Sequence, residues 1–569
     1  MKPVRLPASA TNPLPRWGLL LLCLLYILSG LIGRDPWKNE DAAGFGIMWT
    51  MANGAWQDWL APHIVGLQMP QEGPLAWWIG AVCIKLFGWL LGDVLAARLA
   101  TVFFFLLGTF AVWHGTYLLG RRPEAQPLRL AFGGQPEPRD YGRTLADGAL
   151  LIYLGCLGLL VHSHSTSANA LQVSMVGIAL YAAVRYVDKP SNLAALLLGV
   201  ALGLLALTRG WLVPLALWLG LLALDLARSR KAALRLLGLS MPAALLLGAS
   251  WALAAQWLLP AASSPIPDWM AWNLDHVGMP RWNTLKYLIS NGIWFSWPAW
   301  PFAAWAVYAW RKQSLPPHIA LPLAFCLALT TLALLTPRPD EGTLLPLLPP
   351  LAMLAAFGLP TMKRGAINAV DWFSVMILSA CAGFIWLGWI AKQTGWPAWL
   401  AKNAFKLAPG FKPEFNLFTL LIAVAASVAW IFLVHWRISR RPSVLWRAVV
   451  LSSGGVILCW LLLMTLWLPW GNYMRSYAIV AREMATQMPP QSCLGSTITP
   501  AQRASFAYFS KIRFERLDQE RCDHLLLSST RHVKADPVIH RSDGDWQLVW
   551  EGHRPSDRNE RFRLYRRIP

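Results

Sequence analysis

Long runs of apolar residues, separated by short polar segments, dominate the first 470 positions of the chain. An α-helix needs about 20 apolar residues to cross a bilayer. Thirteen runs of about this length predict thirteen membrane-spanning helices, at 17–33, 94–119, 146–161, 171–184, 193–207, 211–224, 236–259, 291–310, 318–336, 343–360, 372–391, 417–436 and 448–470. The first run follows Lys2, Arg5 and Arg16 and has no small-residue cleavage site, so it is expected to stay as an anchor.

Lysine and arginine residues between the runs predict which loops face the cytoplasm, because cytoplasmic loops carry an excess of both. With a cytoplasmic N-terminus, the basic residues fall in the cytoplasmic loops, at Arg121, Arg122, Arg129, Arg139, Arg143, Arg185, Lys189, Arg228, Arg230, Lys231, Arg235, Arg311, Lys312, Lys363, Arg364, Arg437, Arg440, Arg441 and Arg447. An odd number of spans then places the C-terminus outside.

The first outside loop, residues 34–91, is predicted to carry two helices on the membrane surface. Counting the apolar segment 73–90 as a span would invert every later loop and place the arginine clusters outside. We therefore expect it to lie along the outer face, with Trp77 and Trp78 at the interface. The second helix is indicated by helical spacing within 42–53, in Phe45, Met48, Trp49 and Ala52.

Composition excludes a water-soluble protein. Hydrophobic residues make up 56% of the chain and charged residues only 14%, against about 25% in a soluble domain. The mean hydropathy is +0.41. The net charge of +21 is not interpreted as a nucleic-acid footprint, because the basic residues follow the membrane-topology pattern. No nucleic-acid partner is predicted.

After residue 470 the composition becomes that of a soluble domain, with sixteen of the Lys and Arg residues in 471–569. We predict a small outside α/β domain of about a hundred residues. Its expected elements are a helix at 474–488, strands at 512–516 and 524–528, and a hairpin of 545–551 with 561–566 around the turn PSDRNE.

The eight cysteines contain no CxxC pair and no cysteine–histidine cluster with zinc spacing. Six lie in apolar segments and are expected to pack as small hydrophobic residues. Cys493 and Cys522 lie in the outside domain, where a disulfide is permitted, and we expect them to form one.

The densest acidic group lies in the first outside loop, in Arg34-Asp35-Pro36-Trp37-Lys38-Asn39-Glu40-Asp41, and Glu72 follows further along. Acidic residues beside a bilayer are costly and are expected to serve a site. The alternative is that Asn39, Glu40 or Asp41 caps the following helix, where free N–H groups need acceptors. The spacing leaves both interpretations open.

The sequence resembles the bacterial aminoarabinose lipid A transferases, which belong to the polyprenyl-phosphate-dependent GT-C glycosyltransferases together with the protein O-mannosyltransferases. In the first loop the resemblance rests on Glu40-Asp41, Phe45, Trp59, Pro62-His63, Gly66-Leu67, Glu72, Pro74-Leu75 and Trp77-Trp78. Further segments are LALTRG ending at Gly210, MAWNLDHVG at 270–278 and TPRPDEGTLLPLLPPLAML at 336–354. Three departures, Gly73 for Lys, Asn169 for Asp and Thr343 for Tyr, prevent the exact substrates from being carried over.

The resemblance implies an all-α polytopic membrane protein of GT-C type, with about thirteen transmembrane helices and a small C-terminal periplasmic α/β domain. The transmembrane domain would span 1–470 and the periplasmic domain 471–569, in the bacterial inner membrane with a cytoplasmic N-terminus. The implied activity is transfer of a sugar from a polyprenyl-phosphate donor to a periplasmic acceptor, with a lipid A-like glycolipid favoured over another envelope glycan or a protein.

An outside site has no access to nucleotide sugars, so its donor must arrive on a lipid phosphate, which needs cations. The candidates are Arg209, Arg281 and Arg338, with Arg34 and Lys38; singly, each could instead snorkel to lipid headgroups. A hydroxyl acceptor also needs a base, for which we choose Asp41, with Glu40 or Glu72 orienting the acceptor or stabilising an oxocarbenium charge. His276 and Asn169 join the site through the resemblance.

Two other classes of function remain as alternatives. A transporter or flippase of lipid-linked sugars would be expected to show internal repeats or ionisable residues at the membrane midplane, and the sequence shows no convincing repeat. An envelope scaffold would leave the acidic loop unexplained. His162 and His164 have no third ligand at metal spacing. No cofactor is predicted, the need for a divalent cation stays open, and membrane lipids are expected partners.

Overall fold

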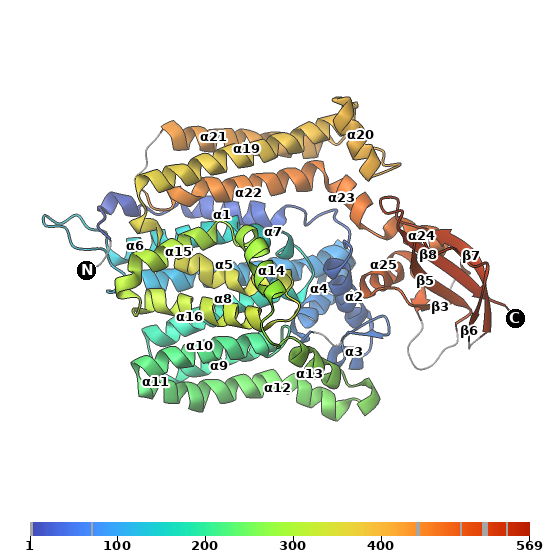
Figure 1. The fold of residues 1–569 in the computed structure, drawn as a ribbon, viewed down its shortest axis with the longest axis horizontal. Helices are drawn as coiled ribbons and strands as arrows, with labels where there is room; N and C mark the ends of the chain where they lie inside the picture. Colours follow the sequence, from blue (N-terminus) through green and yellow to red (C-terminus); the bar gives the residue numbers. More distant parts are fainter. Residues whose placement is uncertain are drawn as a thin grey trace.

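The structure is a computed structural model that describes residues 4–69, 72–439, 444–489, 492–514, 522–541 and 544–568. It is a bundle of apolar helices with a small sheet domain at one end (Figure 1). Among the described residues, nine helical stretches are long and apolar enough to cross a membrane: Ala8–Leu28, Asp93–Gly120, Ala168–Asp188, Arg230–Leu258, Pro317–Leu335, Glu341–Thr361, Gly365–Thr394, Leu417–Arg437 and Val449–Leu466.

Each of the thirteen predicted runs is largely helical. The helices of this region are α1 (Arg16–Leu28), α5 (Asp93–Gly120), α6 (Pro138–Gly155), α7 (Leu157–His162), α8 (Ala168–Asp188), α9 (Asn192–Ala206), α10 (Leu212–Arg228), α11 (Arg230–Arg235), α12 (Met241–Leu258), α13 (Ile266–Asp275), α14 (Trp282–Phe295), α15 (Ala299–Trp310), α16 (Pro317–Leu335), α17 (Glu341–Leu344), α18 (Leu348–Ala356), α19 (Arg364–Thr394), α20 (Ala398–Leu407), α21 (Leu417–Ser439), α22 (Arg447–Leu466) and α23 (Leu468–Arg475). The all-α membrane fold is therefore confirmed, while the count of thirteen spans stays a prediction.

Four predicted runs are interrupted rather than continuous. The run 146–161 changes helix at Cys156, the run 448–470 changes helix at Trp467, and the run 291–310 breaks between α14 and α15. The run 343–360 is divided into α17, a 3-10 turn at Leu345–Leu347 and α18, because proline lacks the N–H that a continuous helix needs. The loop 336–340 joins α16 to α17.

The bundle has buried central helices and apolar outer ones. The Glu341–Thr361 stretch is 83% buried inside the protein, whereas Leu417–Arg437 is only 11% buried. Exposed side chains on α21 include Phe418, Ile431 and Phe432. An exposed apolar surface of this kind is unfavourable in water. The outer helices therefore present the surface expected to face lipid.

The first loop is built from α2 (Glu40–Asn53), α3 (Gln57–Leu60), a hairpin of β1 (His63–Ile64) and β2 (Leu67–Gln68), and α4 (Leu75–Leu91). Protein encloses α2 on several sides, since nine of its residues are buried, including Asp41, Phe45 and Met48. In contrast, α4 keeps an exposed apolar face, where Trp89 is 82% exposed. Trp77 was expected at the interface, but it is buried in the core because its face of α4 packs against α2 and α5.

The C-terminal domain has a six-stranded sheet in the order β4-β3-β5-β8-β7-β6. Its elements are α24 (Ala478–Ala485), β3 (Cys493–Ser496), α25 (Pro500–Ser510), β4 (Arg513–Phe514), β5 (His524–Thr530), β6 (Val538–Arg541), β7 (Gly544–Gly552) and β8 (Glu560–Arg567). The predicted hairpin is confirmed, since β7 and β8 pair antiparallel. Of the predicted strand 512–516, residues 515 and 516 lie outside the described residues, as do Lys2, Arg440 and Arg441 of the topology argument.

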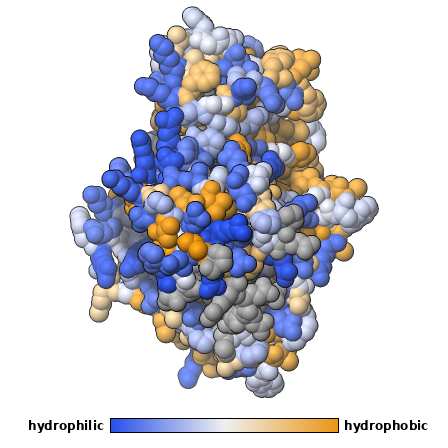
Figure 2. Space-filling view, turned by 90° about the vertical axis from the view of Figure 1, so that its right-hand side faces the viewer, coloured by the Kyte–Doolittle hydropathy of each residue, from blue (hydrophilic) through white to orange (hydrophobic). Residues whose placement is uncertain are grey.

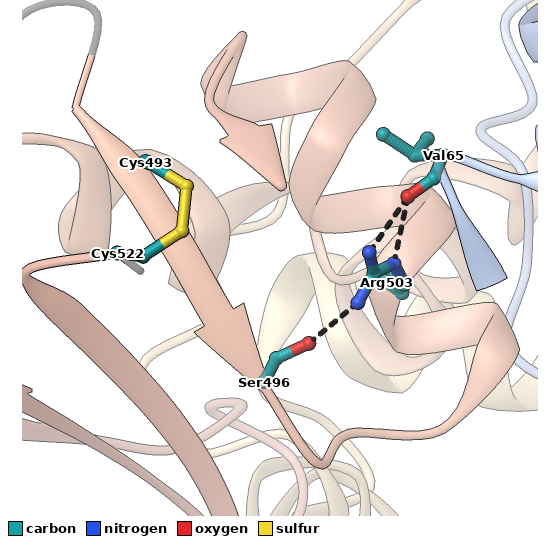
Figure 3. Close-up of a disulfide and its surroundings, with 5 residues drawn as sticks. All are labelled: Val65, Cys493, Ser496, Arg503 and Cys522. Atoms are coloured by element: carbon teal, nitrogen blue, oxygen red, sulfur yellow. Dashed lines mark hydrogen bonds between the residues drawn. A yellow bond between two sulfur atoms is a disulfide. The ribbon is translucent and has the colours of Figure 1, made fainter. Parts of the chain in front are cut away.

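The predicted disulfide between Cys493 and Cys522 is confirmed. It joins β3 to the segment that leads into β5 (Figure 3). The domain does not stand apart from the membrane part, because α25 packs on α2. Ala504 approaches Gly46, and Tyr508 places its ring edge-on to Phe45, with centroids 4.9 Å apart. Docking of α25 thus fixes the helix that begins with Glu40 and Asp41.

Candidate functional site

Asp41 is the centre of a buried network at the outer end of the bundle. One carboxylate oxygen lies 3.1 Å from Arg34 and 3.3 Å from Arg98 of α5, and accepts a hydrogen bond from the backbone N–H of Trp37 at 3.1 Å. The other oxygen accepts from both the N–H and the hydroxyl of Thr166, at 2.8 and 3.0 Å. With five donors around it and only 5% exposure, the carboxylate has little room for a substrate.

The pKa of Asp41 follows from this environment. Burial alone would raise it, but Arg34 and Arg98 and the backbone N–H groups of Thr166 and Trp37 outweigh burial and lower the pKa to about 2. A carboxylate held this firmly ionised is a weak proton acceptor. The geometry therefore fits Asp41 as a positioning residue and gives no support to its predicted role as the base.

Helix capping, the alternative interpretation of the acidic residues, also differs from what is found. Asn39 occupies the N-cap position of α2 with φ of 73° and makes no capping bond through its side chain. Asp41 bonds to Trp37 and Thr166, which lie outside the first turn of α2. The loop that carries Thr166 also lies close to the backbone of α2. A Cβ atom at position 44 would lie 1.7 Å from the carbonyl oxygen of Thr166, so this position requires glycine.

A second group of polar side chains links three of the predicted site residues to Glu72. The Nε atom of Arg209 lies 3.0 Å from a carboxylate oxygen of Glu72, and its Nη1 donates to Asn169 Oδ1 at 2.6 Å. Asn169 in turn donates through Nδ2 to Glu40 at 3.0 Å. The guanidinium also faces the Trp272 ring, with 5.4 Å to its centroid. The loop, the start of α8 and the end of α9 thus meet in one Glu72–Arg209–Asn169–Glu40 chain.

Electrostatics in this chain differ from those around Asp41. Burial raises the pKa of Glu72, and the negative charges of Glu40 and Asp340 raise it further against the opposing effect of Arg209. A carboxylate with a raised pKa accepts a proton more readily than an ordinary one. Glu40 is exposed. Glu72 and Glu40 are therefore better placed for proton transfer than Asp41.

A small pocket of about 70 Å³ opens beside Arg209 and has a mixed polar and apolar lining. Its polar lining residues come from helices and from the loops between them, and include Gln172, Arg209, Trp272, Asn273, His276, Asp340 and Thr343. An apolar groove of about 340 Å³ shares Ala333 with the pocket and is lined by side chains of α14 and α16, among them Leu285, Ile289, Phe295 and Leu334. The polar groups of the pocket therefore lie next to an apolar space.

The loop before α17 completes the pocket wall. Asp340 accepts from the N–H of Thr343 at 2.9 Å and so begins α17 with a capping box. A side chain at Gly342 would approach both Arg209 and Asn169, so this turn lies directly against the Glu72–Arg209–Asn169–Glu40 chain. Thr343, the departure from the family's tyrosine, is therefore both a cap residue and a pocket residue.

The other predicted cations lie outside the polar chain and do not line the pocket. Arg281 and Arg338 are exposed on neighbouring loops, which are joined by a hydrogen bond from Gly278 N–H to Leu335 O at 2.7 Å. Lys38 is half-buried beside Arg475, whose carbonyl accepts from its backbone N–H. Arg34 is buried against Asp41 and is not at the pocket.

His276 lines the pocket, as the resemblance implied, and its Nδ1 lies 2.7 Å from Trp272 O. The two histidines considered as a metal pair have other partners. His162 lies 2.7 Å from Glu341, and His164 is buried with its ring nitrogens beside the carbonyls of Leu160 and Tyr26. No group of three or more His, Cys, Asp or Glu side chains that could hold a metal occurs in the described part of the chain.

Local packing explains why position 73 is glycine, where the family has lysine. Its N–H donates to Arg209 O at 3.0 Å, and an added Cβ would lie 2.2 Å from the carbonyl oxygen of Leu207. Backbone contact at this point leaves no room for a side chain. The cation that lysine would supply is absent at this position, and Arg209 is the cation nearest to Glu72 among the contacts described above.

Several site residues were missed from the sequence. Arg98 lies inside an apolar run, and its charge alone was the signal that it needs a partner. Trp272 and Asp340 lie in the segments that carry the resemblance but were not singled out there, and Thr166 carries no motif that separates it from ordinary loop residues. Their proximity follows from helix packing rather than from spacing in the chain.

Comparisons with known proteins identify the fold. No protein-family model and no curated protein matches the sequence. Two solved structures of ArnT from Cupriavidus metallidurans match it over nearly the whole chain. The structure bound to undecaprenyl phosphate has a TM-score of 0.64 at 15% identity and covers 96% of each chain. The apo structure has a TM-score of 0.64 at 16% identity and covers 96% of this chain and 97% of that one. The fold implied by the resemblance is therefore confirmed.

Proposed function

We propose that this protein is an integral-membrane glycosyltransferase that takes a sugar from a polyprenyl-phosphate donor and transfers it to a periplasmic acceptor. The observation that carries the proposal is the Glu72–Arg209–Asn169–Glu40 chain, whose Arg209 lines a small pocket that adjoins an apolar groove. A polyprenyl phosphate needs both surfaces, since its phosphate requires a cation and its tail an apolar channel. The ArnT structure with bound undecaprenyl phosphate, which has the same fold, supports this class of donor.

In the proposed reaction the acceptor oxygen forms a bond to the anomeric carbon of the sugar, and the bond from that carbon to the donor phosphate breaks. The polyprenyl phosphate leaves with one more negative charge, which Arg209 would stabilise at the pocket wall, with Arg281 and Arg338 on the adjacent loops. Glu72 would accept the acceptor's proton, because burial and the negative charges of Glu40 and Asp340 raise its pKa, while Arg209 holds its carboxylate in place.

Asp41, Arg34 and Lys38 take supporting roles in this proposal. Asp41 and Arg34 fix the loop that carries Glu40, and Lys38 borders that loop. His276 and Asn169 would orient the substrate, the first from the pocket wall and the second through Arg209 and Glu40. We favour a lipid A-like glycolipid as acceptor, with another envelope glycan or a protein as the alternatives, in the bacterial inner membrane.

The test is mass spectrometry of envelope lipids, glycans and proteins from a deletion strain. We expect one glycosyl-sized mass increment to disappear on deletion and to return with the wild-type gene but not with Glu72→Gln. Glu414→Gln changes an exposed acid on the α20–α21 connection and should restore the increment. Identical envelope components in the wild-type and deletion strains would refute transfer.

A further inference from the structure

The short helix α20 is held close to the membrane by its neighbours. It lies between α19 and α21, which are both long and apolar enough to cross a membrane. The connections on either side are short, so α20 cannot move far from the bilayer surface. Figure 1 shows it at the end of the bundle that carries the C-terminal domain.

Exposed apolar side chains around α20 face away from the protein. Trp396 is 71% exposed, Trp399 61% and Leu407 57%, although each is large. Tryptophan is enriched where protein meets the membrane–water interface. Together with its position, this surface is typical of a helix that lies in the headgroup region.

The same helix carries two lysines next to the C-terminal domain. Lys402 and Lys406 lie one helical turn apart and are both exposed. They form one wall of a groove of about 690 Å³, whose other wall is the β7–β8 turn with the exposed Arg558. Asp557 also lines the groove, but its carboxylate is paired with Arg554 at 3.0 Å. Lys402, Lys406 and Arg558 outnumber this one acid, so the lining of the groove is net positive.

Both walls of the groove are fastened to adjacent residues of α23. The Tyr473 hydroxyl donates to Pro409 O at 2.6 Å, at the end of the α20 wall. On the other side, Arg554 Nη1 and the Ser556 hydroxyl donate to Met474 O, at 2.8 and 3.0 Å. Tyr473 and Met474 are neighbours in the chain. Their hydrogen bonds therefore hold the two walls of the groove at a fixed distance from each other. Figure 2 views this end of the molecule.

We propose that this groove binds the phosphate headgroup of an anionic phospholipid of the outer leaflet and so docks the C-terminal domain on the membrane. Lys402, Lys406 and Arg558 supply the charge, while the exposed tryptophans place the groove at headgroup depth. Phe405, which also lines the groove, offers an apolar contact to the first carbons of the acyl chains. This site is separate from the pocket at Arg209 and does not rest on the proposed reaction.

The test uses the full chain in nanodiscs that contain phosphatidylcholine with one quarter phosphatidylglycerol. Native mass spectrometry then measures which lipids the protein retains on release. The variant is Lys402→Gln with Lys406→Gln and Arg558→Gln. Its matched control is Lys511→Gln with Arg513→Gln and Arg531→Gln, which removes three exposed cations of the C-terminal domain that do not line the groove.

We expect the wild type and the control to retain phosphatidylglycerol in excess of its share of the nanodisc. A juxtamembrane cation contributes about fivefold to binding of an anionic surface, so the groove variant should lose on the order of a hundredfold in preference. Equal melting temperatures would show that all three proteins are folded. Unchanged preference in the groove variant overturns the proposal, as does equal occupancy of the groove by inorganic phosphate alone.

Discussion

The carboxylate of Asp41 lies 3.3 Å from the guanidinium of Arg98, which belongs to a helix predicted to cross the membrane. Arg98 also donates from its two Nη atoms to the backbone carbonyls of Arg34 and Asp35. One arginine of the bundle therefore binds both the charge and the main chain of the first loop. This pairing attaches the loop to the bundle at the position where α2 begins.

Asp41→Asn should destabilise the protein rather than only reduce its activity. The substitution keeps the size of the side chain but leaves Arg34 and Arg98 buried without their counter-charge, which costs about 3–5 kcal/mol. Thermal unfolding of the purified protein measures this loss. Asp35→Asn serves as the control and should change stability by less than about 0.5 kcal/mol, because Asp35 contributes to the network through its backbone carbonyl. An Asp41→Asn variant that is inactive but as stable as the wild type would contradict this prediction and would support Asp41 as the base.

Acid should remove the contribution of Asp41 within a defined pH range. Its pKa is lowered to about 2 in the folded protein, so its contribution to stability is present above the ordinary pKa of about 4 and is lost as the pH falls through about 2. The shift corresponds to about 2 kcal/mol. Unfolding measured between pH 6 and pH 2 should show a decline that is smaller by this amount in Asp41→Asn than in the wild type. Parallel pH profiles would contradict the assignment.

Glu72→Gln should abolish most transfer while the protein stays folded. Loss of a general base typically costs 10²–10⁴-fold in rate. Because the pKa of Glu72 is raised, the wild-type rate should fall on the acid side at a pH above the ordinary glutamate value. Glu40→Gln removes one of the charges that raise this pKa, so the acid limb of its rate profile should move to lower pH. An acid limb that does not move would show that Glu72 is not the titrating group.

Arg503→Lys should loosen the attachment of the C-terminal domain to the first loop. Arg503 donates from Nε and Nη2 to Val65 O, at 3.1 and 2.7 Å, and from Nη1 to Ser496 (Figure 3). Lysine cannot reproduce this fork of donors. The free energy of local opening at residues 63–66 should fall by about 1–3 kcal/mol, so backbone hydrogen exchange there should become faster. Arg513→Lys, at an exposed position of β4, is the control and should leave that exchange unchanged.

Reporter fusions should place the C-terminus and the 121–137 loop in opposite compartments. The chain termini lie at opposite ends of the bundle (Figure 1). The 121–137 loop joins the N-terminal segment, since Leu128 N–H donates to Val4 O and Ala8 N–H to Gly134 O, both at 2.8 Å. A fusion after residue 130 should therefore report the cytoplasm and a C-terminal fusion the periplasm. The same compartment for both would refute the topology.

Apolarity alone located the nine described helical stretches that are long and apolar enough to cross a membrane, such as those of α19 and α21, because lipid requires long apolar segments. The interruption between α14 and α15 was not predicted, although Pro298 directly precedes α15 and proline disfavours a continuous helix. In the C-terminal domain β5, β7 and β8 were predicted, but β3 and α25 were not. Strand β3 is only four residues long and contains Gly495, so it lacks a clear alternating pattern.

The candidate site was only partly predictable for a different reason. Glu40, Glu72, Arg209 and Asn169 were each recognised, but the sequence could not indicate that they form one chain. Asp41 stood beside Glu40 in the same motif, and only packing separates their environments, one buried and the other exposed. Charge and spacing thus singled out these residues as candidates, whereas helix packing decides the environment of each.

The docking of α25 on α2 also sets an order for synthesis. Arg503 and Val65 are 438 positions apart in the chain, so the first loop reaches the outer side long before its partner has been made. At about 5–20 residues per second, the interval is roughly 20–90 s. During this time Phe45 and the neighbouring face of α2 lack the cover of Tyr508 and Ala504. The ribosome must therefore complete the last segment of the protein before the first loop can reach its final packing, and a chain truncated before residue 500 would leave that face of α2 permanently uncovered.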